Sequence, residues 1–353
     1  MKKIILTGGG TAGHVTPNIA LLPSLIKQNF DIYYIGTKNG IEKNLIEKEN
    51  IKYYDIPAGK LRRYISKENI IDIFKVIKGI KESYFIIKKI KPDIVFSKGG
   101  FVALPVVIGA KLNNIPIIIH ESDITPGLAN KIAIPFAKIV CTTFPETLKY
   151  IPKNKGINTG TPIRKLLFDG DKQTGIKMCK FSENKPIIMI MCGSLGSVKI
   201  NTQIRSILKN LLSNFNIIHI CGKNNLDNSI KLKGYKQFEY LSEELPHIMA
   251  CADIIISRAG SNSISEFLAL KKPNLLIPLS ANASRGDQIL NANSFEKQGF
   301  SMVLKEENMN PNSLEKSILE LFNNRKKYIS NMENKLNSNS INEIINIINK
   351  YRK

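Results

Sequence analysis

The chain has 353 residues, of which 43% are hydrophobic, which is enough for two domains with buried cores. The 51 Lys and Arg outnumber the 29 Asp and Glu, so the formal net charge is +22 and we expect anionic partners. Zinc fingers and RNA-binding signatures are absent from the sequence, which disfavours nucleic acid and leaves phosphorylated substrates or an anionic membrane surface. Five scattered cysteines without C-x-x-C spacing argue against a zinc site and fit a reducing cytoplasm.

In the first half of the chain, short Ile- and Val-rich runs alternate with helix-like stretches, which indicates βαβ units around a parallel sheet. The strands expected there are 3–6, 32–35, 53–56, 94–97, 115–120 and 139–142. The first strand ends in a glycine-rich turn, GGGTAG at 8–13, where backbone N–H groups can approach a phosphate. The dinucleotide pattern needs an acidic residue at the end of the second strand, but Lys38 stands there, which disfavours a nicotinamide dehydrogenase.

His14 directly follows this turn, at the edge of the sheet where α/β proteins bind their ligands. A histidine can take a proton from a hydroxyl group near neutral pH. The residues alone leave two interpretations open, a catalytic base and a structural or phosphate-contacting histidine.

The stretch 68–91 is predicted to be a helix with more apolar residues than one buried face needs. We expect one face to pack on the sheet, formed by Ile70, Ile73, Phe74, Ile77, Tyr84 and Ile87. The surplus is Ile71, Val76, Phe85, Ile86 and Ile90, surrounded by Arg62, Arg63, Lys67, Lys75, Lys78, Lys81, Lys88, Lys89 and Lys91. Apolar side chains surrounded by cations are suited to shallow insertion into an anionic lipid surface. The alternative interpretation of this stretch is an ordinary helix that is buried on two sides.

Two further polar motifs follow predicted strands of the first half. The turn at 98–101 (KGGF) is a third candidate anion cradle, with an ordinary strand-to-helix turn as the alternative. Glu121 and Asp123 follow the strand at 115–120, where they could act as bases, hold sugar hydroxyls or cap neighbouring helices.

The second half repeats the first. Strands are expected at 187–191, 216–220, 238–240, 254–257 and 274–277, after a Gly-, Pro- and Asn-rich hinge at 150–186. A second glycine turn follows at 193–196, and Ser263 with Glu266 fits a helix capping box. The competing interpretation has Glu266 on ribose hydroxyls and the amides of 261–263 at a diphosphate. Asp169 and Asp171 read as a surface loop, so neither metal nor cofactor is implied.

Taken together, these segments resemble the peripheral-membrane N-acetylglucosaminyltransferases of peptidoglycan synthesis, the MurG family. The matching motifs run in the family's order over nearly the whole chain: 9–14 (GGTAGH), 98–101 (KGGF), 120–123 (HESD), 161–164 (TPIR), 193–196 (GSLG), 258–266 (RAGSNSISE) and 287–288 (DQ). The chain departs from many members at Ala12, Asp123 and Asp287, where they have Gly, Asn and Gln.

The resemblance implies an α/β glycosyltransferase-B fold, two Rossmann-like parallel-sheet domains facing a cleft. Residues 1–163 would take the lipid-linked acceptor, undecaprenyl-diphosphate-N-acetylmuramoyl-pentapeptide, and dock on the cytoplasmic side of the cell membrane. Residues 164–340 would bind UDP-N-acetylglucosamine, and 341–353 would form a closing helix. Two alternative functions stay open, another UDP-sugar enzyme (a glycolipid synthase or an epimerase) and a non-catalytic membrane scaffold.

Carried over by position, the resemblance also assigns residues. The donor would be bound by Thr11, Ala12, Gly13, Arg164, Ser194, Leu241, Ser261, Asn262, Ser263, Ile264, Ser265, Glu266 and Gln288, and the acceptor diphosphate by Gly10, Gly99 and Gly100. We expect an inverting transfer in which the 4-hydroxyl of N-acetylmuramic acid attacks the anomeric carbon. His14 is the predicted base, with Asp123 in reserve. Amides after Gly193 and Gly260, together with Arg164, would stabilise the leaving diphosphate.

Overall fold

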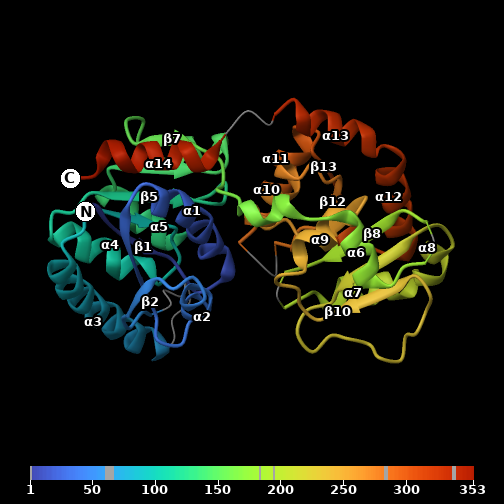
Figure 1. Ribbon diagram of the computed structural model, residues 1–353, viewed down its shortest axis with the longest axis horizontal. Coiled ribbons are helices and arrows are strands. Elements are labelled where there is room, and N and C mark those ends of the chain that lie inside the picture. Colours follow the sequence, from blue (N-terminus) through green and yellow to red (C-terminus); the bar gives the residue numbers. More distant parts are fainter. Residues whose placement is uncertain (1, 60–66, 183, 194, 282–284, 336–338) are drawn as a thin grey trace. The chain divides into compact units, whose positions relative to one another are not determined.

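The computed structural model describes residues 2–59, 67–182, 184–193, 195–281, 285–335 and 339–353. Internal contacts divide the chain into unit 1, formed by Met1–Arg164 and Ser338–Lys353, and unit 2, formed by Lys165–Asn337. The last helix, which we expected to be a separate closing element, therefore belongs to the same unit as the N-terminus. Both units are parallel α/β sheets, as predicted, and they are described separately below (Figure 1).

Unit 1 contains a seven-stranded parallel sheet with the order β3-β2-β1-β4-β5-β6-β7. Its strands are β1 (Lys2–Thr7), β2 (Phe30–Gly36), β3 (Lys52–Asp55), β4 (Ile94–Ser97), β5 (Ile117–Glu121), β6 (Ile139–Thr142) and β7 (Gly156–Asn158). The strand order reverses between β1 and β4, and in open parallel sheets ligands bind at the carboxyl ends of the strands at such a point. The prediction missed β7, which is only three residues long and begins at a glycine.

Helices cover both faces of this sheet. They are α1 (Thr16–Lys27), α2 (Ile41–Glu47), α3 (Lys67–Ile90), α4 (Ala103–Leu112), α5 (Leu128–Ala133) and α14 (Ser340–Tyr351), with the short 3-10 helices η1 (Ala12–His14), η2 (Ile134–Phe136) and η3 (Pro145–Tyr150). On one face Leu21 of α1 and Ile344 of α14 pack against Leu6 of β1 in a single core, and α14 lies beside α1 (Figure 1). On the other face Ile87 of α3 and Val106 of α4 form a second core with Val95 of β4.

The orientation of α3 confirms Ile87 as a residue of the predicted packing face and corrects most of the rest. Ile73, Phe74 and Ile77 were expected to pack on the sheet, but they are 52%, 68% and 57% exposed. The buried side is formed instead by Asp72, Gly79, Ser83, Ile87 and Ile90. Small residues occupy this face because neighbouring segments pack closely against it. A Cβ on Gly79 would collide with the carbonyl oxygen of Pro57, and a Cβ on Gly109 of α4 would lie 2.9 Å from Cβ of Ser83. Arg62 and Arg63 lie outside the described residues, and so do the side chains of Lys67, Ile70 and Ile71.

Unit 2 contains a six-stranded parallel sheet with the order β10-β9-β8-β11-β12-β13. Its strands are β8 (Ile187–Met191), β9 (Asn216–Ile220), β10 (Tyr235–Phe238), β11 (Ile254–Ser257), β12 (Asn274–Leu276) and β13 (Ser301–Val303). The strand predicted at 238–240 begins three residues earlier, at Tyr235. It directly follows Gly234, the last residue of the preceding loop, which has a φ of 82°. The three-residue β13 was not predicted.

The helices of unit 2 are α6 (Lys172–Cys179), α7 (Val198–Ser206), α8 (Leu208–Asn214), α9 (Leu245–Cys251), α10 (Ser261–Ala269), α11 (Asp287–Lys297), α12 (Pro311–Asn323) and α13 (Arg325–Glu333), with η4 (Lys165–Asp169) and η5 (Glu306–Asn308). Its core joins Ile200 of α7 and Ile318 of α12 to Ile256 of β11. Elements β7, η4 and α6 occupy much of the stretch 150–186, which we had expected to be a hinge.

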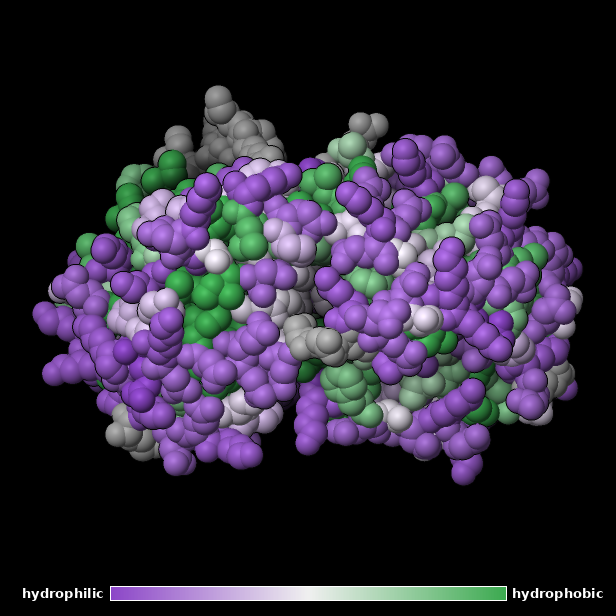
Figure 2. Space-filling model, turned by 90° about the horizontal axis from the view of Figure 1, so that it is seen from above, coloured by the Kyte–Doolittle hydropathy of each residue, from purple (hydrophilic) through white to green (hydrophobic). Residues whose placement is uncertain are grey.

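The surface reflects the composition. Hydrophilic side chains cover most of the face seen in Figure 2, with apolar patches between them. None of the helices in the described ranges combines the length and the apolar character that crossing a bilayer requires.

Candidate active site

Three of the predicted motifs in unit 1 meet at neighbouring strand ends. The turn at 8–10 follows β1, the turn at 98–101 follows β4, Glu121 ends β5 and Asp123 follows it, and these strands are adjacent in the sheet. The first two turns are in direct contact, because a Cβ on Gly100 would collide with the carbonyl oxygen of Gly9 and lie 2.9 Å from Cδ2 of His14. Gly100 has a φ of 81°, so both its conformation and its surroundings require glycine.

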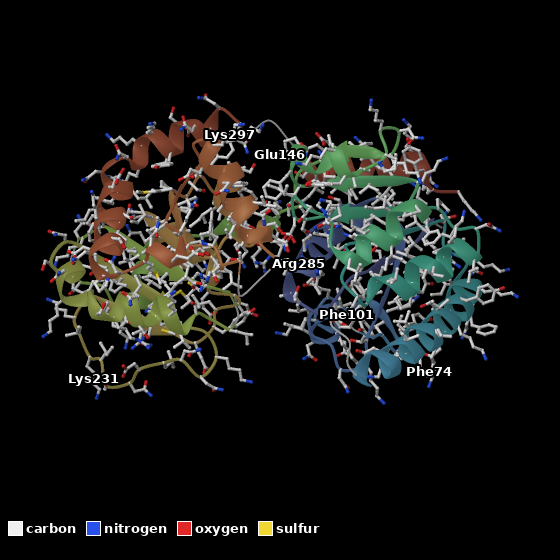
Figure 3. All side chains as sticks on the ribbon, turned by 180° about the vertical axis from the view of Figure 1, so that it is seen from behind. Phe74, Phe101, Glu146, Lys231, Arg285 and Lys297 are labelled. Carbon is white, nitrogen blue, oxygen red and sulfur yellow. The ribbon has the colours of Figure 1, made fainter. Side chains whose placement is uncertain are left out.

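The second contact between these turns involves Gly10 and Phe101. A side chain on Gly10 would collide with the ring of Phe101, a residue labelled in Figure 3. The turn after β1 and the turn after β4 therefore pack directly against each other, and His14 lies beside them.

Lys98 and His120 lie beneath these turns and are completely buried. Lys98 Nζ lies 2.7 Å from Nδ1 of His120 and also donates to Ser122 Oγ, while Nε2 of His120 lies 2.8 Å from the carbonyl oxygen of Gly160. Burial, followed by the charge of Lys98, lowers the pKa of His120 well below its ordinary value. His120 is thus a neutral structural residue whose two ring nitrogens are both in use.

Glu121 organises the loop that follows β5. Its carboxylate accepts hydrogen bonds from the backbone N–H groups of Ser122 (2.8 Å), Asp123 (3.0 Å) and Gly127 (3.1 Å) and from the side chain of Asn130 (2.8 Å). Of the roles considered for this acid, the structure supports the capping role and leaves no lone pair for a proton-transfer role. The capped loop carries Asp123, which is half-buried.

The two candidate bases stand on either side of β4. His14 ends η1, where its N–H donates to the carbonyl oxygen of Thr11 (3.1 Å), and its side chain is half-buried. Thr11, Ala12 and Gly13 precede it in the same short helix or at its start. Since β1, β4 and β5 are neighbours, His14 and Asp123 share the ligand-binding edge of this sheet.

One residue in this site escaped the sequence analysis. Glu42 Oε2 accepts a hydrogen bond from the N–H group of Gly10 (3.1 Å), the glycine assigned to the acceptor diphosphate. Glu42 lies 32 positions away from Gly10, on α2. The sequence around it indicates only an acidic residue in the first turn of a helix, which does not predict this contact.

In unit 2 the ligand-binding edge lies between β8 and β11. Gly193 and Gly196 follow β8 with φ values of 83° and 69°. Arg258 follows β11, and its guanidinium donates to Ser197 Oγ (2.9 Å), Glu306 Oε1 (2.5 Å) and the carbonyl oxygen of Ile277 (3.1 Å). Since Ser197 is the N-cap of α7, Arg258 fixes the turn that contains the second glycine motif.

The helix α10 begins at Ser261 and has Gly260 as its N-cap, so the predicted capping box of Ser263 and Glu266 is wrong. The amides of 261–263 instead form the first turn, where N–H groups lack partners within the helix and the dipole favours an anion. Ser265 Oγ donates to the carbonyl oxygen of Ser261 (2.7 Å), and Ile264 is buried in the core.

The remaining assigned residues are more dispersed. Leu241 is buried just after β10, and Gln288 Oε1 accepts from the N–H group of Leu279 (3.0 Å). Arg164 is the last residue of the first segment of unit 1. Asn262 and Glu266 lie in α10 with the serines, and Ser194 lies outside the described residues.

Comparison with known proteins agrees with this description. Residues 4–142 match the glycosyltransferase family 28 N-terminal domain, and residues 187–348 match the glycosyltransferase family 28 C-terminal domain. A protein of Clostridium novyi is 61% identical over 99% of both chains, and one of Clostridium botulinum is 59% identical over the whole of both. Both are named UDP-N-acetylglucosamine--N-acetylmuramyl-(pentapeptide) pyrophosphoryl-undecaprenol N-acetylglucosamine transferase.

Among solved structures, MurG of Acinetobacter baumannii has a TM-score of 0.75 at 25% identity and covers 99% of this chain and 100% of its own. A UDP-GlcNAc 2-epimerase of Neisseria meningitidis has a TM-score of 0.68 at 16% identity, over 99% of this chain and 100% of its own, which shows a common fold. Two Rossmann-like units with glycine turns at their ligand edges define the class of two-domain sugar-nucleotide enzymes. Within that class, the chain belongs to glycosyltransferase family 28, which confirms the resemblance found in the sequence.

Proposed function

We propose that the protein transfers N-acetylglucosamine from UDP-N-acetylglucosamine to the 4-hydroxyl of N-acetylmuramic acid in undecaprenyl-diphosphate-linked muramoyl-pentapeptide. It is thus a hexosyltransferase of peptidoglycan and cell wall synthesis. The observation that carries this proposal is the identity of 61% and 59%, over essentially the full length, with proteins named for this transfer.

The donor is assigned to unit 2. The first-turn amides of α10 and the turn at 193–196 provide N–H groups and a helix dipole for the diphosphate, and Glu266 offers a carboxylate for the ribose. As the bond to the sugar breaks, negative charge grows on the leaving diphosphate, and these fixed amides with Arg164 stabilise it. Arg258 supports this arrangement from below by holding the N-cap of α7.

The acceptor is assigned to the ligand edge of unit 1. His14 takes the proton of the attacking hydroxyl, and Asp123 is the reserve base. His120 is unsuited to this role, since its pKa is far below neutral and its ring nitrogens are engaged. Because the Gly10 amide is bound to Glu42, the acceptor diphosphate rests on Gly99 and Gly100 rather than on Gly10.

A peripheral position on the cytoplasmic face of the membrane completes the proposal. The exposed side of α3 carries Ile73, Phe74, Ile77 and Phe85, and the exposed residues Lys78, Lys81 and Lys88 lie on the same helix. Phe74 lies on the outer side of the helix (Figure 3). Apolar side chains among cations suit the interface of an anionic bilayer.

The decisive experiment measures UDP release from UDP-N-acetylglucosamine with and without a soluble lipid-linked muramoyl acceptor. We expect release only with the acceptor and a disaccharide product in equal amount. Epimerised UDP-sugar formed without the acceptor, or transfer to diacylglycerol instead, would contradict the proposal.

A further inference from the structure

Glu42 is a completely buried acid beside the first glycine turn. Its Oε2 accepts the N–H group of Gly10 (3.1 Å), and its Oε1 accepts the N–H group of Thr37 (3.1 Å) and the hydroxyl of the same residue. Every described donor to this carboxylate therefore comes either from the turn after β1 or from the end of β2.

The chain makes room for this carboxylate with glycines. A Cβ on Gly9 would lie 2.6 Å from Cδ of Glu42, and a Cβ on Gly40 would collide with the same carboxylate. Neither glycine has a positive φ, so the space taken by Glu42, rather than backbone conformation, requires glycine at both positions.

A buried polar shell holds the same segment in place. Tyr34 donates to the carbonyl oxygen of Gly8 (2.6 Å), and Tyr53 donates to that of Thr37 (2.7 Å). The carboxylate and its two backbone partners are thus fixed from both sides, which makes this a preorganised arrangement.

The glycine turn of unit 2 differs at its first glycine. A Cβ on Gly193 would meet no described atom within 4 Å, although one on Gly196 would collide with the carbonyl oxygen of Cys221, whereas the Glu42 carboxylate fills the space beside Gly9 in unit 1. In nucleotide-binding folds the turn after the first strand offers its N–H groups to a phosphate. In unit 1, a side chain of the protein already supplies the negative charge at that place.

We propose that Glu42 is a resident anion that acts as a positioning and specificity residue. It occupies the phosphate-binding position of the first glycine turn and thereby excludes nucleotide diphosphates from unit 1. By holding Gly10, it also fixes the contact of Gly9 with Gly100, beside which His14 lies. The part of this proposal that concerns turnover rests on the proposed function, while the exclusion of diphosphates does not.

The test compares E42Q and E42A with E47Q, a matched control on the same helix whose carboxylate is 55% exposed and pairs with Lys43. In E42Q, the side-chain NH2 group replaces one of the two oxygens that accept the N–H groups of Gly10 and Thr37. One of these two backbone hydrogen bonds is therefore lost. We expect E42Q to lower kcat by about 100-fold through a misplaced His14, with the KM for UDP-N-acetylglucosamine unchanged and E47Q equal to wild type. In E42A, added formate should restore part of the lost turnover.

A binding measurement tests the exclusion independently of activity. By calorimetry with inorganic pyrophosphate, E42A should gain one weak site that wild type and E47Q lack. A folded E42A without that site overturns the exclusion. Equal turnover of E42Q and E47Q, or a rise in donor KM that matches the loss in kcat, overturns the positioning role.

If E42A does not fold, T37V replaces it, because this variant keeps the carboxylate but removes one of its donors. An intermediate loss of kcat is then expected, and wild-type kcat in T37V contradicts the proposal. If wild type shows no transfer at all, the proposed function fails, and the pyrophosphate measurement still decides the role of Glu42.

Discussion

Lys98 Nζ lies 2.7 Å from Nδ1 of His120, and both side chains are completely buried. Since an ammonium group can only donate, Nδ1 must accept, and the proton of the imidazole lies on Nε2, which donates to Gly160. This pair ties the ends of β4 and β5 to the loop after β7. It also removes His120 as a candidate base, which is consistent with the proposal that His14 takes the proton.

Substituting Lys98 should change how stability depends on pH. Burial lowers the pKa of Lys98 to about 8, below its value in the unfolded chain. Between pH 8 and the unfolded pKa near 10.5, the unfolded state holds one more proton, so the free energy of unfolding of wild type gains up to about 1.4 kcal/mol per pH unit. Urea unfolding at pH 7.5 and 9.5 should show this gain in wild type and not in K98M. A control, K111M, replaces an exposed lysine of α4 and should behave as wild type.

Substituting His14 tests the predicted base. H14A should lower kcat by about 10²- to 10⁴-fold, since positioned proton transfer contributes that much. Binding of UDP-N-acetylglucosamine, measured by calorimetry, should stay within a few-fold of wild type. Unchanged turnover in H14A would remove this residue as the base.

Loss of charge should affect stability more at Glu121 than at Asp123. E121Q places an NH2 group against some of the four donors that the carboxylate serves, which should cost about 2–3 kcal/mol of unfolding free energy. D123N keeps the backbone N–H group that donates to Glu121 and changes only a half-buried side chain, so it should lower the free energy of unfolding by less than E121Q does and change kcat only slightly. Thermal melts and steady-state kinetics on both variants distinguish the two roles. A loss of kcat in D123N as large as that in H14A would make Asp123 the base.

The exposed face of α3 should determine membrane binding. Replacing Phe74 and Ile77 by serine removes two side chains that are 68% and 57% exposed, so folding should be little affected. Affinity for vesicles with anionic lipid should fall at least about 10-fold, as expected from losing the burial of two large apolar groups. L319S on α12 alters an exposed apolar residue of unit 2 and should bind vesicles like wild type. Equal binding of the double variant and L319S in a sedimentation assay would contradict a docking role for α3.

Much of the fold could be predicted because its signals are local. Continuous Ile and Val runs indicated β4, β6, β8, β9 and β11 at their observed bounds, since strands covered on both faces need apolar residues at every position. The face of α3 could not be predicted from hydrophobicity. Close packing favours Gly79 and Ser83 there and leaves Phe74 outside. Helix spacing identified Ile87 correctly but placed Ile73, Phe74 and Ile77 on the wrong side.

The candidate site divides in a similar way. The sequence placed the glycine turns at strand ends, where the structure has them, because glycine and strand ends are recognisable in short segments; that these edges bind ligands stays a prediction. The helix start at α10 was misplaced by the capping pattern of Ser263 and Glu266, which competes with a helix that begins at Ser261. Glu42 and Arg258 were not recognised as supports of the turns, since each acts on a residue far away in the sequence.

The sequence by itself thus determined two parallel α/β units, the family to which they belong and the short motifs at their ligand edges. Local backbone preference and apolar pattern are enough for these. Only the tertiary structure decided which polar groups there are already engaged: Gly10 by Glu42, His120 by Lys98 and Gly160, and the loop after β5 by Glu121. For Gly10 and His120 the physical reason is that a hydrogen bond between residues 22 to 40 positions apart depends on strand order and burial, and residue spacing along a chain encodes neither. The Glu121 bonds are local, but burial selected this capping role among the alternatives that the sequence left open.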